Sequence, residues 1–112
     1  MDLYKIIIAP EAMEQLNEYV SYIKYELMNA SAARSVYDDA TETGSELAKV
    51  AGSLQYCRSP LLRKYGYRVI LFRHHQYLMV YRIEGKIAYV DGIFHQKQDY
   101  ENLFVGMHGL KR

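Results

Sequence analysis

Residues 67–94 read YRVILFRHHQYLMVYRIEGKIAYVDGIF, a run of apolar residues in which the spacing has a period of two. This period, together with the many β-branched and aromatic residues, is typical of half-buried β-strands. Two short interruptions divide the stretch, a turn at 74–76 and the pair Glu84-Gly85. We therefore expect an antiparallel meander of three strands, 67–73, 77–83 and 87–94.

The preceding part of the chain follows a helical period. Residues 4–8 are short and β-branched and predict a strand. Pro10 suits the first position of a helix, and apolar residues continue at helical spacing to Leu27. Ser31 is expected to cap a second helix that ends near Leu54, so the two helices form an antiparallel hairpin.

The order of these elements predicts an α+β fold. A loop over 55–66 joins the second helix to the meander. An antiparallel sheet that includes the N-terminal strand, with the helical hairpin packed on one face, buries both apolar stripes. The length of 112 residues suits one domain, 1–112. At its end we expect one helical turn over 99–104 and a flexible tail over about 105–112.

The composition excludes several classes of protein. Hydrophobic residues make up 50% and charged residues 24%, which is typical of a globular chain and not of a disordered one. The sequence contains no apolar run near the ~20 residues that a membrane span needs. Cys57 is the single cysteine, which excludes an internal disulfide and fits a reducing compartment. We therefore expect a cytoplasmic protein that does not enter a membrane.

The charges are distributed unevenly along the chain. Residues 57–112 hold ten of the fourteen basic residues but only four of the thirteen acidic ones. Such asymmetry can mark a surface for an anionic partner, although acidic residues on the solvated faces of two helices would explain the first half equally well.

The chain resembles the RelE/ParE family of type II toxin–antitoxin toxins over nearly its whole length. The resemblance is carried by three stretches in order: Gly66-Tyr-Arg-Val-Ile70, Tyr77-Leu-Met-Val-Tyr-Arg-Ile83 and Phe94-His-Gln-Lys-Gln-Asp-Tyr100. It implies a small toxin held inactive by a co-expressed antitoxin. One branch of the family cuts messenger RNA on the ribosome, and the other poisons DNA gyrase without being an enzyme.

The basic and aromatic residues of the last strands are the candidates for RNA cleavage. This reaction needs groups that move protons and a cation that stabilises the phosphorane-like transition state. Arginine binds phosphate oxygens, histidine transfers protons near neutral pH, and tyrosine stacks on unpaired bases. By resemblance, several of these residues stand where RNA-cutting members keep functional groups. The candidate catalytic residues are Arg68, His95, Lys97, Tyr81 and Tyr100, and the candidate RNA-binding residues are Arg73, Tyr77 and Arg82.

Other interpretations of these residues stay open. Tyr77 and Tyr81 alternate with apolar residues, so at least one of them is expected to fill the core. Many RNA-cutting relatives have an arginine where this chain has Leu78, which argues against cleavage, whereas His95 and Lys97 are retained. We predict a toxin that inhibits translation by ribosome-dependent messenger-RNA cleavage, with a non-enzymatic gyrase poison or a degenerate toxin that only binds its antitoxin as the alternatives. We interpret His74-His75 as a turn and predict neither a metal site nor a cofactor.

The expected partners follow from the resemblance and from the charge. An acidic antitoxin segment that folds on binding would cover the basic surface, and an open sheet edge would accept a strand. The target is the ribosome with its messenger RNA, or DNA gyrase in the alternative. The cleavage hypothesis requires that the guanidinium, imidazole and ammonium groups lie on one common surface.

Overall fold

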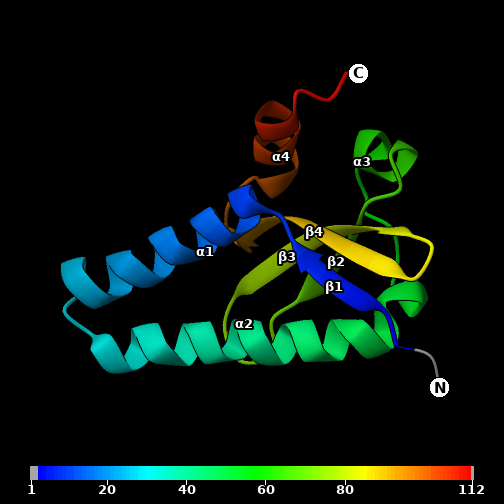
Figure 1. Ribbon diagram of the computed structural model, residues 1–112. Helices are drawn as coiled ribbons and strands as arrows, with labels where there is room; N and C mark the ends of the chain where they lie inside the picture. Colours follow the sequence, from blue (N-terminus) through cyan, green and yellow to red (C-terminus); the bar gives the residue numbers. More distant parts are fainter. Residues whose placement is uncertain (1–2, 112) are drawn as a thin grey trace.

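The computed structural model describes residues 3–111, which form a four-stranded sheet with helices on both faces (Figure 1). The two long helices pack together along one face, and the C-terminal helix lies on the opposite side of the sheet. The elements in order are β1 (Lys5–Ile8), α1 (Pro10–Ser21), η1 (Tyr22–Glu26), α2 (Ala30–Val50), η2 (Ala51–Ser53), α3 (Pro60–Lys64), β2 (Arg68–Leu71), β3 (Tyr77–Glu84), β4 (Ile87–His95) and α4 (Tyr100–His108).

The sheet confirms the α+β fold and the meander. Its strands lie in the order β1-β4-β3-β2, and β2, β3 and β4 pair antiparallel. The N-terminal strand differs from the expectation, because β1 runs parallel to β4. Parallel neighbours need a long connection, and the helices α1 to α3 and the strands β2 and β3 between β1 and β4 supply one. β1 and β2 are therefore the two edges of the sheet.

The helical hairpin forms as expected, with a different cap. Pro10 occupies the first position of α1, and Leu16 is buried against the sheet. The second helix is capped by Asn29 and not by Ser31, because the Asn29 side chain accepts a hydrogen bond from the Ala32 N–H at 2.9 Å. This bond satisfies one of the free N–H groups at the helix start.

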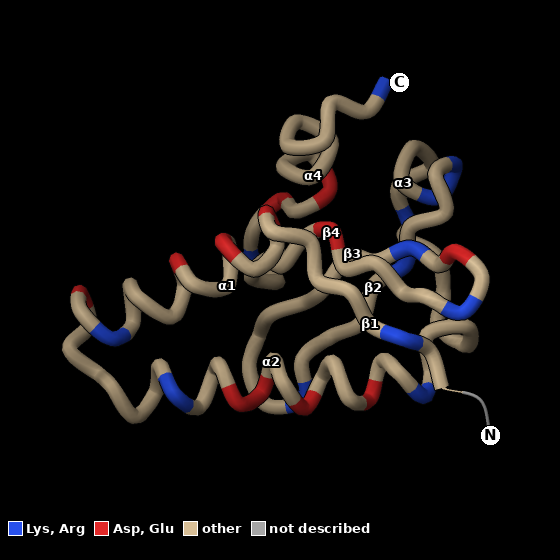
Figure 2. The backbone as a smooth tube through the Cα atoms, viewed as in Figure 1, with Lys and Arg blue, Asp and Glu red and all other residues tan. Residues whose placement is uncertain are grey.

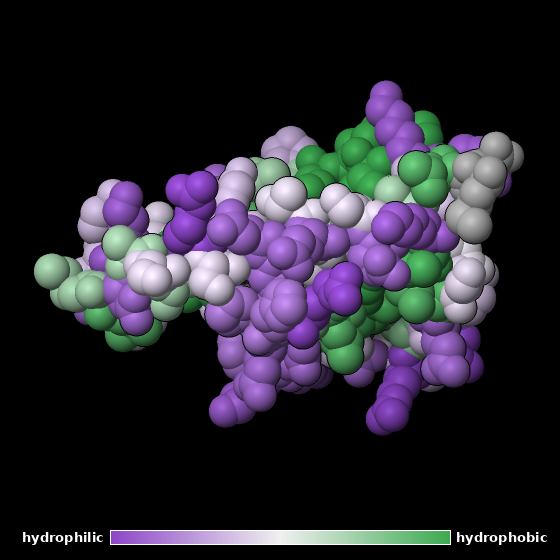
Figure 3. Space-filling model, turned by 90° about the horizontal axis from the view of Figure 1, so that it is seen from below, coloured by the Kyte–Doolittle hydropathy of each residue, from purple (hydrophilic) through white to green (hydrophobic). Residues whose placement is uncertain are grey.

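The tip of the hairpin is an exposed apolar end of the molecule. The chain leaves α1 through one π-helical stretch, η1, and turns at Met28, which has a φ of 53° and is 84% exposed. Leu27 is 56% exposed, so the apolar stripe of the first helix does not stay buried to its end. Figure 3 shows this apolar tip beside the hydrophilic outer surface of the hairpin.

Two buried clusters fill the two faces of the sheet. The helix-side core lies between the sheet and the hairpin and includes Leu16, Val36, Leu47, Met79, Tyr81 and Val90. The C-terminal core lies on the other face and consists of Cys57, Leu62, Tyr67, Leu78, Val80, Phe94 and Phe104. The hairpin therefore covers one face, as expected, while α3 and α4 contribute residues to the second core.

The C-terminal core explains two differences from the expected elements. Leu62 is completely buried, and the segment expected as a loop over 55–66 contains helix α3 around it. Helix α4 continues to His108, past both the helical turn over 99–104 and the proposed start of a tail near residue 105. Buried Phe104 and half-buried Leu110 pack into this core, whereas Arg112 lies outside the described residues. Within 3–111, no helix combines the length and the apolar character needed to cross a membrane.

Candidate functional site

His95 is the last residue of β4 and stands opposite Tyr77 of β3. The two rings meet edge to face, with their centroids 5.0 Å apart. The Nδ1 atom of His95 lies 3.1 Å from the backbone N–H of Lys97, which donates to it. A neutral His95 ring therefore carries its proton on Nε2. Lys97 lies in the turn beyond β4, so the alternation of the strand does not place its exposed ammonium beside His95.

Tyr77 connects His95 to an aromatic group under the hairpin. Its ring centroid lies 5.1 Å from that of Tyr19 and 5.6 Å from that of Phe72. Burial raises the pKa of Tyr77 and is also the main cause of the raised pKa of Tyr19. Beside these rings lies a hollow of about 400 Å³ that His95 lines together with the apolar side chains of the hairpin tip. Tyr77 is thus half-buried among these side chains, and its ring is not free to stack on an RNA base.

Arg68 lies at the other end of the sheet from His95. Its partner on β3 is Tyr81, four residues along the strand from Tyr77, the partner of His95. Four residues of an extended strand span about 13 Å, and one further strand separates the two side chains. The Arg68 guanidinium donates to the carbonyl oxygens of Gly52 at 3.2 Å and Leu54 at 2.7 Å, and it lies 4.2 Å from the Tyr56 ring centroid. The structure therefore does not bring Arg68 to His95.

Tyr81 is a core residue, which corrects its assignment as a catalytic candidate. Its side chain is completely buried, and its hydroxyl donates to the carbonyl oxygen of Ala51 at 2.7 Å. Burial raises the pKa of Tyr81 to about 12, so the phenol is protonated at neutral pH. A group without solvent access cannot contact RNA, and Tyr81 instead ties β3 to the end of α2.

Replacing Tyr81 with phenylalanine is expected to lower the free energy of unfolding by about 1 kcal/mol, because the Ala51 carbonyl loses a buried donor. Growth inhibition by the folded variant should stay unchanged. Urea unfolding followed by circular dichroism measures the first quantity, and Tyr37→Phe, at an exposed position, is the matched control. Lost toxicity at unchanged stability would show that the Tyr81 hydroxyl has a functional role.

Arg82 faces the other side of the sheet and is held in ion pairs. Its Nε lies 3.0 Å from Asp91 Oδ2, and its Nη1 lies 2.8 Å from Glu84 Oε2. Asp91 is the extra residue of a β-bulge, because Val80 pairs with Gly92 and Tyr81 pairs with Val90. A bulge redirects a side chain, and here Asp91 meets both Arg82 and the hydroxyl of Tyr67. The positive charge of Arg82 is therefore balanced within the protein.

Tyr100 and Arg73 complete the set of candidates. Arg73 lies in the β2–β3 turn, at the same end of the sheet as His95, but neither residue contacts His95 within residues 3–111. Tyr100 begins α4, packs 6.3 Å from the Phe94 ring, and lines a hollow with Arg58 and Leu71 near the edge strand β2. Burial raises the pKa of Tyr100 to about 12. Arg73 is exposed in the turn after β2. The predicted residues are therefore not gathered in one place. Arg68 lies on the edge strand β2, and Tyr81 and Arg82 point to opposite faces of the sheet, away from the end that carries Tyr77 and His95.

Asp39 on α2 is the polar residue that the sequence analysis missed. It is 2% exposed, and its carboxylate accepts the backbone N–H groups of Arg73, His74 and His75 at 3.2, 3.0 and 2.8 Å. Its ligand atoms lie within 4.8 Å of those of Glu42 and His74. Because backbone donors already occupy the Asp39 carboxylate, we interpret this cluster as the anchor of the β2–β3 turn. Asp39 follows Val36 by three residues and therefore continues the buried stripe of α2. This spacing is the sequence signal from which its burial could have been predicted.

Comparison with known proteins decides the family. Residues 6–100 match the family model of the ParE toxin of the type II toxin–antitoxin system parDE. The chain belongs to the ParE toxin family. This ParE-family chain is therefore the toxin of a type II toxin–antitoxin module, and its partner is an antitoxin, as the resemblance implied.

A solved structure supports the fold of this ParE-family toxin. The chromosomal ParDE TA system from P. aeruginosa contains a chain that superposes with a TM-score of 0.68 at 17% sequence identity. The match covers 83% of this toxin and 96% of that chain. At this identity the likeness concerns the fold alone. No curated protein sequence matches this toxin.

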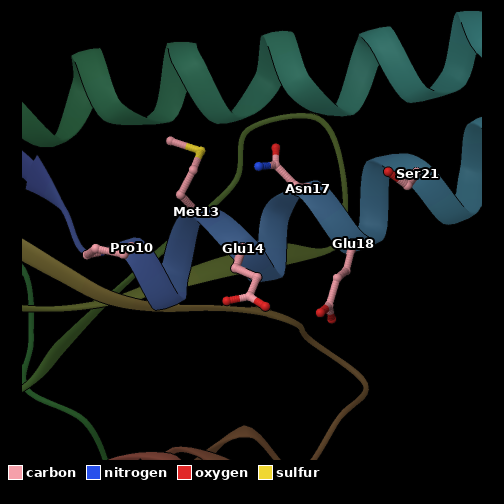
Figure 4. Close-up of a pocket in the computed structure, with 6 residues that line it drawn as sticks. All are labelled: Pro10, Met13, Glu14, Asn17, Glu18 and Ser21. Carbon is pink, nitrogen blue, oxygen red and sulfur yellow. The ribbon is translucent and has the colours of Figure 1, made fainter.

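Another hollow of this ParE-family toxin lies along α1 and contains none of the predicted site residues (Figure 4). It measures about 520 Å³. Figure 4 shows Met13 and Asn17 pointing toward α2, whereas the carboxylates of Glu14 and Glu18 point away from it. Within residues 3–111 this pair of carboxylates forms no ion pair with an arginine and no contact with His95, so the hollow adds no member to the candidate site.

Proposed function

We propose that this toxin acts without catalysis, by binding and poisoning DNA gyrase, and that it does not cut messenger RNA. The family match to ParE favours this branch of the RelE/ParE family. The observation that carries the proposal is the separation of the groups that RNA cleavage would need together: Arg68 lies about 13 Å along the sheet from the level of His95.

The chemistry explains why this separation matters. A phosphoryl transition state gains most from cations and proton donors held in contact with it, and a displacement of even 1 Å lowers the rate. In this toxin the charge of Arg82 is paired with two carboxylates, and Tyr81 is buried. His95 keeps an aromatic neighbour, Tyr77, but no arginine contacts it within residues 3–111.

Leu78 supports the same conclusion. It stands where RNA-cutting relatives have an arginine, and it is only 3% exposed. Its side chain packs into the C-terminal core beside Phe94 and Phe104. A single change back to arginine would place a charge in this core and would not restore a cation beside His95.

A gyrase cleavage assay tests the proposal directly. Purified toxin is incubated with gyrase, ATP and supercoiled plasmid, and the reaction is stopped with detergent and protease. We expect linear, protein-linked DNA to accumulate with toxin concentration. In parallel, translating ribosomes with a defined messenger RNA should show no new 5′ ends by primer extension.

The double variant His95→Ala/Lys97→Ala separates the two mechanisms. A gyrase poison that needs no proton transfer should keep its DNA-cleavage activity within about twofold in this variant. Its melting temperature, measured beside the parent, controls for folding. Ribosome-dependent cuts that disappear in the double variant, with gyrase unaffected by the parent toxin, would overturn the proposal in favour of the nuclease. Absence of both activities and of growth inhibition would favour a degenerate toxin.

A further inference from the structure

The hairpin tip, residues 22–29, exposes several large apolar side chains close together in the sequence. Figure 1 shows that the tip reaches past the end of the sheet. Tyr22 is 57% exposed and Tyr25 is 64% exposed, and Leu27 and Met28 are exposed beside them. A group of exposed apolar side chains on a globular protein often marks a surface that binds another molecule. The tip is therefore a candidate interaction surface.

Met28 occupies a backbone conformation that methionine does not favour. Its φ of 53° lies in the left-handed region, where glycine and asparagine are the usual residues. Burial does not explain the choice of methionine either, because this residue is the most exposed of the large apolar residues in the part of the chain described, 3–111. A contact outside the folded chain would account for an apolar side chain at this position.

A hollow of about 330 Å³ lies beside the tip, between the end of the first helix and the first turns of α2. The residues that line it are Val20, Lys24, Ala30, Ala33, Arg34 and Tyr37. Its alanines and Val20 leave room for an unbranched apolar side chain such as that of methionine. One end of the molecule therefore carries both a projecting apolar side chain and a hollow that can receive one.

The tip also carries both signs of charge. Lys24 and Glu26 are exposed in η1, on either side of Tyr25. Figure 2 shows a basic and an acidic position side by side at this end of the helix. Neither residue belongs to an ion pair among residues 3–111, where the arginine and histidine pairs lie elsewhere. Both charges are therefore available to a partner.

The exposed apolar area suits a weak interface. A large residue has an area of roughly 200 Å², so the exposed fractions of Tyr22, Tyr25, Leu27 and Met28 correspond to roughly 500 Å² on one molecule. Two such surfaces bury about 1,000 Å² in total, which is close to the lower limit for a specific interface. The tip can therefore support a reversible complex and not a permanent one.

We propose that the hairpin tip is the interface of a weak, symmetric homodimer of this toxin. Met28 of each molecule enters the hollow beside Tyr37 of the other, and Lys24 of each molecule pairs with Glu26 of the other. A two-fold interface must carry both halves of every contact on the same surface, and the tip does so for the apolar contact and for the charges. The proposal does not depend on whether the toxin acts on gyrase.

Other occupants fit the tip less well. Nucleic acids and anionic lipids bind surfaces with an excess of cations, whereas acidic residues lie along α1 and α2 behind the tip (Figure 2). A different protein would use the apolar side chains, but it would need only one half of each contact. A second copy of the chain uses the projecting Met28, the hollow, Lys24 and Glu26 together.

Sedimentation-velocity ultracentrifugation of the whole purified toxin tests the proposal over about 1–300 µM. We expect a monomer at the lowest concentration and a dimer at the highest, with a Kd on the order of 10–100 µM. In amide NMR spectra, the shifts that grow with toxin concentration should be largest over residues 22–37.

Exchanging the charges identifies the second copy as the occupant. Lys24→Glu and Glu26→Lys each bring like charges together across the two-fold axis and should weaken self-association at least about tenfold. In a mixture of the two variants every pair again has opposite signs, so a mixed dimer should form with the parent affinity within about threefold. Lys86→Glu, in the exposed turn between β3 and β4, changes the net charge equally and should leave association unchanged.

Met28→Gly separates the interface from the fold. This change removes the projecting side chain and should weaken self-association at least about fivefold. The melting temperature at about 1 µM, where the toxin is expected to be monomeric, should stay the same or rise, because glycine adopts a φ of 53° without strain. The mixing experiment does not use this variant, so a poorly folded Met28→Gly would not prevent the test.

Three results would overturn the proposal. The first is a monomer at every concentration, including one whose tip amides shift only when another protein is added. The second is self-association that both charge variants leave unchanged or that mixing them does not restore. The third is a set of concentration-dependent shifts that maps to the sheet or to α4, which would place the contact elsewhere.

Discussion

Replacing Asp39 with alanine is expected to lower the free energy of unfolding by about 3 kcal/mol, because three backbone N–H groups lose a charged acceptor at once. Each hydrogen bond to a charged group contributes about 1.5–3 kcal/mol, and partial access of water to the turn reduces the sum. For a chain of this size the melting temperature should fall by roughly 12 °C. Urea unfolding and thermal melting measure the two quantities.

The neighbouring residue supplies the control. Asp38 is exposed and pairs with Arg34 one helical turn away, so Asp38→Ala should change the free energy of unfolding by about 0.5 kcal/mol or less. Asp39→Asn keeps an oxygen acceptor and should fall between the two. If Asp39→Ala costs no more than Asp38→Ala, Asp39 is not the anchor of the β2–β3 turn. A parent stability that rises with added divalent cations, and no longer does so in Asp39→Ala, would instead indicate a metal site at Asp39, Glu42 and His74.

The periodic spacing of apolar residues predicted the main strands and helices well, because each period reflects a local conformational preference of the backbone. Apolar alternation placed β3 and β4 within one residue of their observed ends. Helical spacing and Pro10 placed the start of α1. The parallel pairing of β1 with β4 could not be predicted in this way, because the connection between them is long enough to allow either direction.

The candidate site was harder to predict because contacts distant in sequence decide the state of each side chain. Arg68 looked like a free phosphate ligand, but its guanidinium binds carbonyl oxygens fourteen and sixteen residues earlier in the chain. Alternation along β4 also fails at Asp91, where the bulge inserts one residue and changes which side chains share a face. No local sequence pattern predicts such a bulge or a hydrogen bond to a distant carbonyl oxygen.

The second core changes which surfaces remain for partners. Helix α4 and the segment around α3 cover part of the sheet face opposite the hairpin, so that face is not the open surface that the RNA hypothesis required. Leu71 on the outer edge of β2, beyond the Tyr56–Arg68 bridge, and the tip of the hairpin stay exposed. The stability of α4 therefore controls how much of this sheet face stays covered.

Phe104→Ala is expected to lower the free energy of unfolding by about 3–5 kcal/mol, because a fully buried aromatic side chain is removed from the C-terminal core. Phe104 packs edge to face on Tyr67 with centroids 4.7 Å apart, and it lies 4.2 Å from the His108 ring. Gly92 permits this packing, since a Cβ there would lie 3.1 Å from the Phe104 ring. Few neighbouring groups can move into the space that alanine leaves.

The same change should release α4 from the sheet. His108 Nε2 donates to the carbonyl oxygen of the bulge residue Asp91 at 2.9 Å, and this bond depends on the docked helix. Hydrogen exchange should therefore become faster over residues 100–108 in Phe104→Ala, while β3 and β4 stay protected until global unfolding. Leu103→Ala, one residue earlier and 46% exposed, is the control and should cost about 0.5 kcal/mol or less. The expectation would be wrong if Phe104→Ala were no more destabilising than Leu103→Ala and left exchange in α4 unchanged. The last helix would then not be part of the folded core, and residues 105–111 would be a flexible tail, as the sequence predicted.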